Sequence, residues 1–187
     1  MLRELLSRVS ELKGSETDRF LKFLAILNTL LEEKKLGRII IVGGFAAEIY
    51  SGRSYRTGDV DIIIEGGAEE LVRQVLKEIS DQGLRIYLPK IREISEKGID
   101  IVDDVYTRRK PPIRMQVDSS YYVYILPPEE VIITYLEAWK FWNSTEDRIK
   151  AVLVYCTQLS NIDMDYLNSE SERRRVKDYL EKLKGYC

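Results

Sequence analysis

The sequence predicts an α+β protein in which a mixed β-sheet is flanked by helices and both ends of the chain are helical. Apolar residues recur at helical spacing over residues 1–36, β-branched runs occupy the middle of the chain, and helical patterns return after residue 128. Strands grouped between helical ends, without strict alternation, are typical of α+β folds. We therefore expect a helical N-terminal segment at 1–36, a core at 37–128 and a helical C-terminal region at 129–187.

The first 36 residues are expected to form two helices. Gly14-Ser15 interrupts the apolar stripe, and Ser15 with Asp18 offers an N-terminal cap for the second helix. These helices should pack on the sheet, with a partner-binding or dimerising helix pair as the alternative. Further helices are expected at 45–50, 68–82, 130–142, 145–159 and 170–187, and strands at 38–42, 60–64, 84–87 and 99–105. The stretch 113–126 contains a strong strand signal at 121–125.

The composition excludes several kinds of chemistry. Hydrophobic residues make up 44% of the 187 residues, which is enough for a core, and charged residues make up 32% with a net charge of only -2. A polyanionic partner would therefore need a local basic patch. The chain has no histidine, which excludes Ser-His-Asp triads and His-ligated zinc or iron. Carboxylates, lysines, tyrosines or bound ions must carry any reaction.

The cysteines and the hydropathy pattern predict a cytoplasmic protein. Cys156 and Cys187 have neither metal-ligand spacing nor the pattern of a disulfide framework. We expect Cys156 to be a small core residue and Cys187, the last residue, to be mobile. No signal-peptide core begins the chain and charges interrupt every long apolar run, so no membrane contact is expected.

The stretch from Ile39 to Glu65 combines a buried strand, a glycine pair, a short helix and an Asp-x-Asp pair. Gly43 and Gly44 would let the backbone approach a ligand, and the helix that follows would present N–H groups to phosphate. Asp59 and Asp61 are two apart on a strand, so both carboxylates face the same side. Adjacent carboxylates repel each other, and such a pair is usually stabilised by a bound Mg²⁺ (or Mn²⁺) that it shares with substrate phosphates.

The residues Ile41-Val42-Gly43-Gly44-Phe45-Ala46-Ala47, followed by Arg56-Thr57-Gly58-Asp59-Val60-Asp61, resemble the signature of the DNA polymerase beta-type nucleotidyltransferase superfamily. The match is to its small prokaryotic branch, the AbiEii-like proteins of toxin–antitoxin systems. That pattern is hydrophobic-Gly-Gly, a short helix, then Arg-x-Thr-x-Asp-hydrophobic-Asp. A fainter similarity continues through 122–132 to a helix bearing Lys140, so the resemblance spans roughly residues 37–165.

The resemblance implies transfer of a nucleoside monophosphate from a nucleoside triphosphate to a hydroxyl of RNA, such as a tRNA end, or of a protein. Asp59 and Asp61 would hold the metal, Gly43 and Gly44 would receive the phosphates, and Lys140 would approach the nucleotide. A third carboxylate is expected on a neighbouring strand. Asp100 is the best match because apolar strand residues flank it; Asp104 would share its face, Asp103 would point away, and Asp118 is the fallback.

Two arginines and two departures from the pattern leave alternatives open. Arg53 and Arg56 either contact phosphate or are solvated or paired with carboxylates. Gly44 stands where many family members carry a serine, and the segment after Lys140 lacks the usual Arg-x-Lys-Asp pattern. The alternative function is therefore a catalytically inactive fold that binds a nucleotide or a partner protein, for example as a toxin–antitoxin component.

Overall fold

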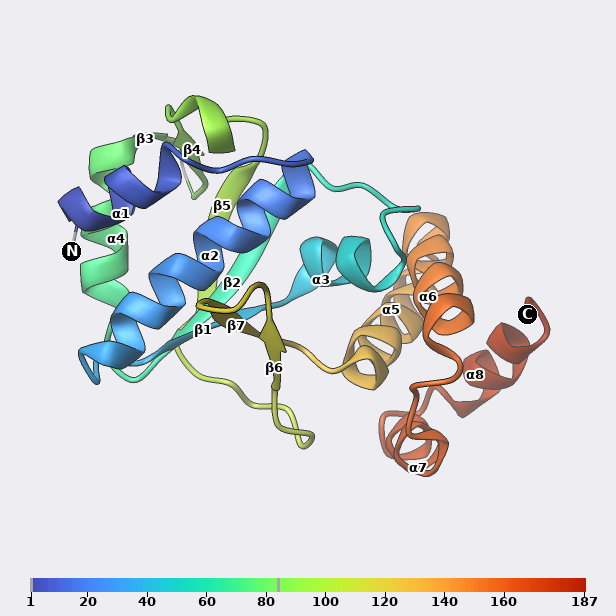
Figure 1. The fold of residues 1–187 in the computed structure, drawn as a ribbon. Helices are drawn as coiled ribbons and strands as arrows, with labels where there is room; N and C mark the ends of the chain where they lie inside the picture. Colours follow the sequence, from blue (N-terminus) through green and yellow to red (C-terminus); the bar gives the residue numbers. More distant parts are fainter. Residues whose placement is uncertain (1, 84) are drawn as a thin grey trace. The chain divides into compact units, whose positions relative to one another are not determined.

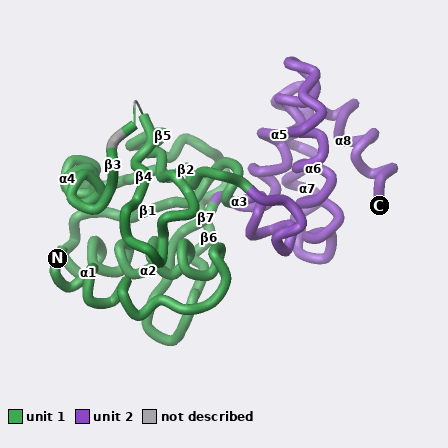
Figure 2. The backbone as a smooth tube through the Cα atoms, turned by 90° about the horizontal axis from the view of Figure 1, so that it is seen from above, with its two compact units in different colours: residues 1–45, 57–125 green, residues 46–56, 126–187 purple. Residues whose placement is uncertain are grey.

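The computed structural model describes residues 2–83 and 85–187, and the chain divides into two compact units (Figure 2). The first unit comprises the chain up to Phe45 and the segment Thr57–Ile125, and the second comprises Ala46–Arg56 and Leu126–Cys187. The helices before residue 36 therefore belong to the same unit as the sheet. Residues 46–56, which lie within the expected core, belong to the second unit.

The first unit is built on a mixed sheet that has seven strands in the described residues, in the order β3-β4-β5-β2-β1-β7-β6 (Figure 1). β1 is antiparallel to β2 and parallel to β7, and β2 is parallel to β5. This arrangement confirms the α+β class. The strands are β1 (Arg38–Ile41), β2 (Asp59–Glu65), β3 (Ser80–Gln82), β4 (Tyr87–Pro89), β5 (Gly98–Asp103), β6 (Ile113–Gln116) and β7 (Tyr122–Ile125).

Helix α2 (Glu16–Glu33) begins at the expected cap and packs on the sheet. The Ser15 Oγ accepts a hydrogen bond from the Asp18 N–H, and the Asp18 carboxylate accepts one from the Ser15 N–H, which is a capping box. The apolar face of α2 is completely buried and lies against β1 and β7. The helices α1 (Leu2–Val9) and α4 (Glu69–Ile79) and the 3₁₀ turn η1 (Arg92–Ile94) complete this unit. The expected packing of the second N-terminal helix on the sheet is confirmed.

The strand signal expected at 121–125, within residues 113–126, corresponds to β7, and residues 113–116 form β6, so the segment is a hairpin of two antiparallel strands. The turn is made by Asp118, whose Oδ1 accepts the N–H groups of Ser120 at 2.8 Å and Tyr121 at 2.9 Å. Such local hydrogen bonding favours a turn over an extended chain. The helix expected over 68–82 ends at Ile79 and is followed by β3. The strand expected at 84–87 overlaps the observed strand β4 only at Tyr87, and Leu84 lies outside the described residues.

The charge of Asp118 should make a small, pH-dependent contribution to stability. Its Oδ2 pairs with Lys22 Nζ at 2.8 Å. Burial alone would raise the pKa of Asp118, but the hydrogen bonds from Lys22 and from the two backbone N–H groups lower it below 3.8. Because the folded pKa is depressed, this stabilisation is present above the unfolded pKa and is lost as the pH falls through the folded pKa.

Asp118→Asn, which keeps an oxygen acceptor for the turn, is expected to lower the free energy of unfolding by about 1 kcal/mol or less at neutral pH. The pair is partly exposed, so solvent screens it. Urea unfolding of both proteins at several pH values checks this. The difference should shrink as the pH falls below the folded pKa, and a difference that does not change with pH would contradict the assignment.

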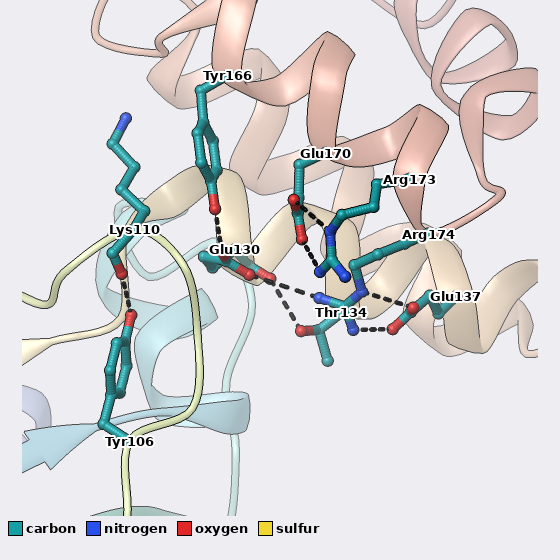
Figure 3. Close-up of polar contacts among 9 residues, drawn as sticks. All are labelled: Tyr106, Lys110, Glu130, Thr134, Glu137, Tyr166, Glu170, Arg173 and Arg174. Atoms are coloured by element: carbon teal, nitrogen blue, oxygen red, sulfur yellow. Dashed lines mark hydrogen bonds and ion pairs between the residues drawn. The ribbon is translucent and has the colours of Figure 1, made fainter.

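The second unit is helical and is held together by an ion-pair network (Figure 3). Arg174 bonds both carboxylate oxygens of Glu137, and its Nη1 lies 3.5 Å from Glu130 Oε2. The Glu130 side chain has no solvent exposure, and it also accepts a hydrogen bond from the Tyr166 hydroxyl. The network therefore joins α7 to α5. The helices of this unit are α5 (Pro128–Trp142), α6 (Thr145–Gln158), α7 (Met164–Arg173) and α8 (Lys177–Lys184).

The single helix expected over residues 170–187 is instead the end of α7 followed by α8. Arg175, between them, has a left-handed φ of +60°. Leu167 and Val176 are both fully buried, and they are nine positions apart, which corresponds to about two and a half helical turns. One continuous helix would therefore place them on opposite faces, whereas the break buries both.

Cys156 and Cys187 form a disulfide with a Cα–Cα distance of 5.7 Å, which corrects the expectations for both residues. Cys156 is only partly buried, and Cys187 is tied to α6 and is not a mobile end. α6 and α8 are in contact, so the chain end returns to Cys156. The two cysteines are 31 residues apart in the sequence, so no local pattern predicts that they pair. Among the described residues, no helix is long and apolar enough to cross a bilayer.

Candidate active site

The turn from β1 into α3 (Gly43–Tyr50) brings the backbone of Gly43 directly against Asp61. Gly43 has a φ of +57°, in the left-handed region. A Cβ built there would overlap the Asp61 carboxylate and lie 2.8 Å from its Cγ. The Val42 N–H donates to the Asp61 carbonyl at 3.0 Å, which fixes β1 and β2 together at this point. Only glycine allows this carboxylate to lie at the start of α3.

Gly44 is packed in the same way against Thr57. A Cβ at position 44 would lie 2.8 Å from Thr57 Oγ1 and 3.2 Å from Thr57 Cβ. The Thr57 hydroxyl donates to Asp59 Oδ1 at 2.8 Å. The space that a serine side chain would need at position 44 is therefore taken by Thr57, which gives a physical reason for glycine at this position.

Three aspartates lie on the same face of the sheet. Val60 and Ile62 are fully buried, whereas Asp59 and Asp61 alternate with them and are half-buried. Asp61 is in register with Asp100 on the parallel strand β5, and register partners on neighbouring strands point to the same side. β2 and β5 therefore bring Asp59, Asp61 and Asp100 onto one surface of the first unit.

The chemistry of these side chains fits a hard divalent cation. Mg²⁺ commonly takes one or two protein carboxylates and completes its shell with water and substrate phosphates. Within residues 2–83 and 85–187, no three cysteine, aspartate or glutamate side chains are already grouped as a metal centre. Asp59 and Asp61 together meet the need for two carboxylates, and Asp100 is placed beside them by strand register alone.

The fallback carboxylates are engaged elsewhere in the first unit. Asp118 forms the β6–β7 turn and pairs with Lys22. The Oδ1 of Asp103 accepts the N–H groups of Asp104 and Val105 at the end of β5. Of the candidates for a third carboxylate, the register favours Asp100.

The basic residues expected at the nucleotide, Arg53, Arg56 and Lys140, belong to the second unit. Arg56 and Lys140 each pair with a carboxylate there. The Arg56 Nε lies 3.6 Å from Glu48 Oε1. The Nζ of Lys140 donates to the carbonyl of Arg175 at 2.6 Å and to Asp178 at 2.7 Å. This hydrogen bond from Lys140 is the main reason that the pKa of Asp178 is lowered. Arg53 is an exposed residue with a φ of +70°.

Thr57 and Lys97 also lie at this site, although no role is predicted for either of them from the sequence. Thr57 precedes Asp59 by two residues within the motif, so its position was visible although its contact was not. Lys97 is fully buried and donates to the Thr57 carbonyl. No local pattern distinguishes a buried lysine from a surface one, because lysine is usually exposed.

Solved structures with a similar fold are nucleotidyltransferase-like proteins. An antigenic nucleotidyltransferase-like protein from Paracoccidioides brasiliensis superposes with a TM-score of 0.55 at 16% identity, covering 92% of this chain and 94% of that one. Two structures of the antibiotic-resistance factor ANT(2'')-Ia give lower TM-scores, each at 16% identity. The solution structure scores 0.47 and covers 87% of this chain and 96% of that one, and the complex with adenylyl-2''-tobramycin scores 0.49 with 80% and 96%.

No protein-family model matches the sequence, and no curated protein is recognisably similar to it. The structural similarity covers nearly the whole chain. The AbiEii-like branch stays a prediction. The chain has a nucleotidyltransferase-like fold.

Proposed function

We propose that this chain is a metal-dependent nucleotidyltransferase that transfers a nucleoside monophosphate from a nucleoside triphosphate to a hydroxyl group. The observation that carries the proposal is the convergence at the start of α3. Gly43 lies against Asp61, Asp61 is in register with Asp100, and Asp59 shares their face. A glycine turn at a helix N-terminus favours phosphate, and carboxylates beside it favour a divalent cation.

Each residue has a distinct role in this proposal. The first N–H groups of α3 have no partner within the helix and point toward an incoming phosphate, which the absence of side chains at Gly43 and Gly44 lets approach closely. Asp59 and Asp61 would hold Mg²⁺ or Mn²⁺, which when bound neutralises negative charge on the phosphates, and Asp100 would help to hold a second ion. Asp100, next to Asp61, is the carboxylate that would favour deprotonation of the acceptor hydroxyl.

The acceptor is proposed to be a hydroxyl of RNA, such as a tRNA end, or of a protein. This follows from the resemblance to toxin-associated nucleotidyltransferases and not from a surface of this chain. Arg53, Arg56 and Lys140 are proposed as phosphate or nucleotide contacts. For Arg56 and Lys140 this would require exchange of a carboxylate partner for the ligand.

Calorimetric titration of each ribonucleoside triphosphate with Mg²⁺ tests the proposal without knowledge of the acceptor. We expect metal-dependent binding by the wild type and its loss in Asp59→Asn/Asp61→Asn, because amides cannot replace two anionic metal ligands. Gln116→Glu, on the exposed strand β6, serves as a surface control that should bind normally. A folded wild type that binds no triphosphate would contradict the proposal.

The second candidate is a nucleotide-binding or partner-binding module without transfer activity. Among the described residues, no three His, Cys, Asp or Glu side chains are already grouped so that they could hold a metal ion. A module that only binds its ligand would have the same arrangement. Asp100→Asn separates the two functions. In an enzyme it should abolish pyrophosphate release while Mg²⁺-dependent triphosphate binding persists, whereas in the module neither protein releases pyrophosphate.

A further inference from the structure

Lys97 has a completely buried side chain in the segment that leads into β5. Burial of an ammonium group is unfavourable unless the group is paired and hydrogen-bonded. Its Nζ lies 2.7 Å from the carboxylate of Glu16, the first residue of α2, and it donates a hydrogen bond to the carbonyl oxygen of Thr57. One buried lysine therefore connects the first turn of α2 to the residue that lies two positions before Asp59.

The segment from Thr57 to Asp59 is held by further contacts from the same region. The Gly98 N–H donates to the Gly58 carbonyl at 3.0 Å, so Lys97 and Gly98 together bond two successive carbonyls. The Thr57 hydroxyl donates to Asp59 Oδ1 at 2.8 Å. These bonds form a continuous chain from the Lys97 ammonium through Thr57 to one carboxylate oxygen of Asp59.

The same ammonium also reaches the first turn of α3. Lys97 Nζ lies 5.7 Å from the centre of the Phe45 ring, and Phe45 directly follows the glycine pair. The Phe45 ring is fully buried, so this contact is internal to the first unit. Lys97 thus contacts both segments that carry the candidate site, the glycine turn and the approach to Asp59, without being exposed to a ligand.

We propose that Lys97 is a positioning residue for Asp59 and that it acts through Thr57. Lys97 holds the Thr57 carbonyl in place, and this fixes the position of the Thr57 hydroxyl. The hydroxyl in turn restricts the orientation of the Asp59 carboxylate. The use of a fixed Asp59 for metal binding rests on the proposed function. The positioning itself is a property of the ligand-free protein and can be measured without it.

Three variants separate the links of this chain of contacts. Lys97→Met keeps an unbranched side chain that is one heavy atom shorter and removes the ammonium. Thr57→Val keeps the shape of the side chain and removes the hydroxyl, whereas Thr57→Ser keeps the hydroxyl and serves as the conservative control. If the contacts act in series, Lys97→Met and Thr57→Val should behave alike and Thr57→Ser should resemble the wild type.

Amide hydrogen exchange of the ligand-free protein is the first measurement. In Lys97→Met and Thr57→Val we expect exchange over residues 57–61 to be about tenfold faster or more, the scale of one hydrogen bond to a charged group, with exchange in β7 unchanged. Unchanged exchange over 57–61, or equal acceleration throughout the first unit, overturns the proposal. If Lys97→Met does not fold, equal behaviour of Thr57→Val and Thr57→Ser overturns it.

Titration of Mn²⁺ with adenosine triphosphate, followed by the electron paramagnetic resonance of free Mn²⁺, is the second measurement. If the wild type binds, Lys97→Met and Thr57→Val should bind about tenfold more weakly and Thr57→Ser should bind like the wild type. Normal binding by a folded Lys97→Met overturns the proposal. If the wild type binds no metal–triphosphate, the proposed function fails, and the exchange measurement alone decides whether Lys97 positions Asp59.

Discussion

Gly43→Ala is expected to weaken Mg²⁺-dependent triphosphate binding by about 10- to 100-fold, the range found when a metal ligand loses its support. Position 43 has no room for a side chain, because a Cβ there would overlap the Asp61 carboxylate. Alanine would force that carboxylate to rotate away from its present place. The effect follows from the same contact that gives the site its geometry, and calorimetric titration measures it.

Backbone strain has to be separated from this contact. Gly43 has a φ of +57°, so alanine there also carries a conformational penalty of about 1–2 kcal/mol. Gly67 is a matched control in the same unit, because its φ is +87° and nothing lies within 4 Å of a Cβ built there. Gly67→Ala should lose similar stability yet bind triphosphate normally. Equal binding by the two variants would contradict the role assigned to the Gly43–Asp61 contact.

The parts of the fold that could be predicted are those specified by neighbouring residues. The run Ile39-Ile40-Ile41 predicted the buried central strand β1, and Ser15 with Asp18 predicted the start of α2. The common face of Asp59 and Asp61 follows from the two-residue period of a strand, and the half-buried alternation of β2 bears it out. Their role in metal binding stays a prediction.

The features that could not be predicted depend on residues far apart in the sequence. Lys97 and Thr57 are separated by 40 positions, and Cys156 and Cys187 by 31. The break at Arg175 arises because Leu167 and Val176 must both be buried, which is decided by packing and not by helix propensity. The pairing of Asp61 with Asp100 could likewise be recognised only from the order of the strands in the sheet. The apolar residues that flank Asp100 did not by themselves exclude the other aspartates as the third carboxylate.

Loss of one partner from the ion-pair network should strongly destabilise the second unit. Arg174→Met is expected to lower the free energy of unfolding by about 3 kcal/mol, because it leaves the fully buried Glu130 without its cationic partner. The Arg174 side chain is only 13% exposed, so water can replace little of what is lost. Both tryptophans of the chain, Trp139 and Trp142, lie on α5 of this unit, so tryptophan fluorescence during urea unfolding reports on it directly.

Two comparisons identify Glu130 as the source of that loss. Lys184 pairs with Glu181 on the same helix, and the Glu181 side chain is 54% exposed, so Lys184→Met should destabilise the unit much less. Glu130→Gln in the Arg174→Met background should restore part of the lost stability, because an amide is far easier to bury than an unpaired carboxylate. The Tyr166 hydroxyl can still donate to the amide oxygen in that double variant. A double variant that is less stable than Arg174→Met would show that the buried charge is stabilised by groups other than Arg174.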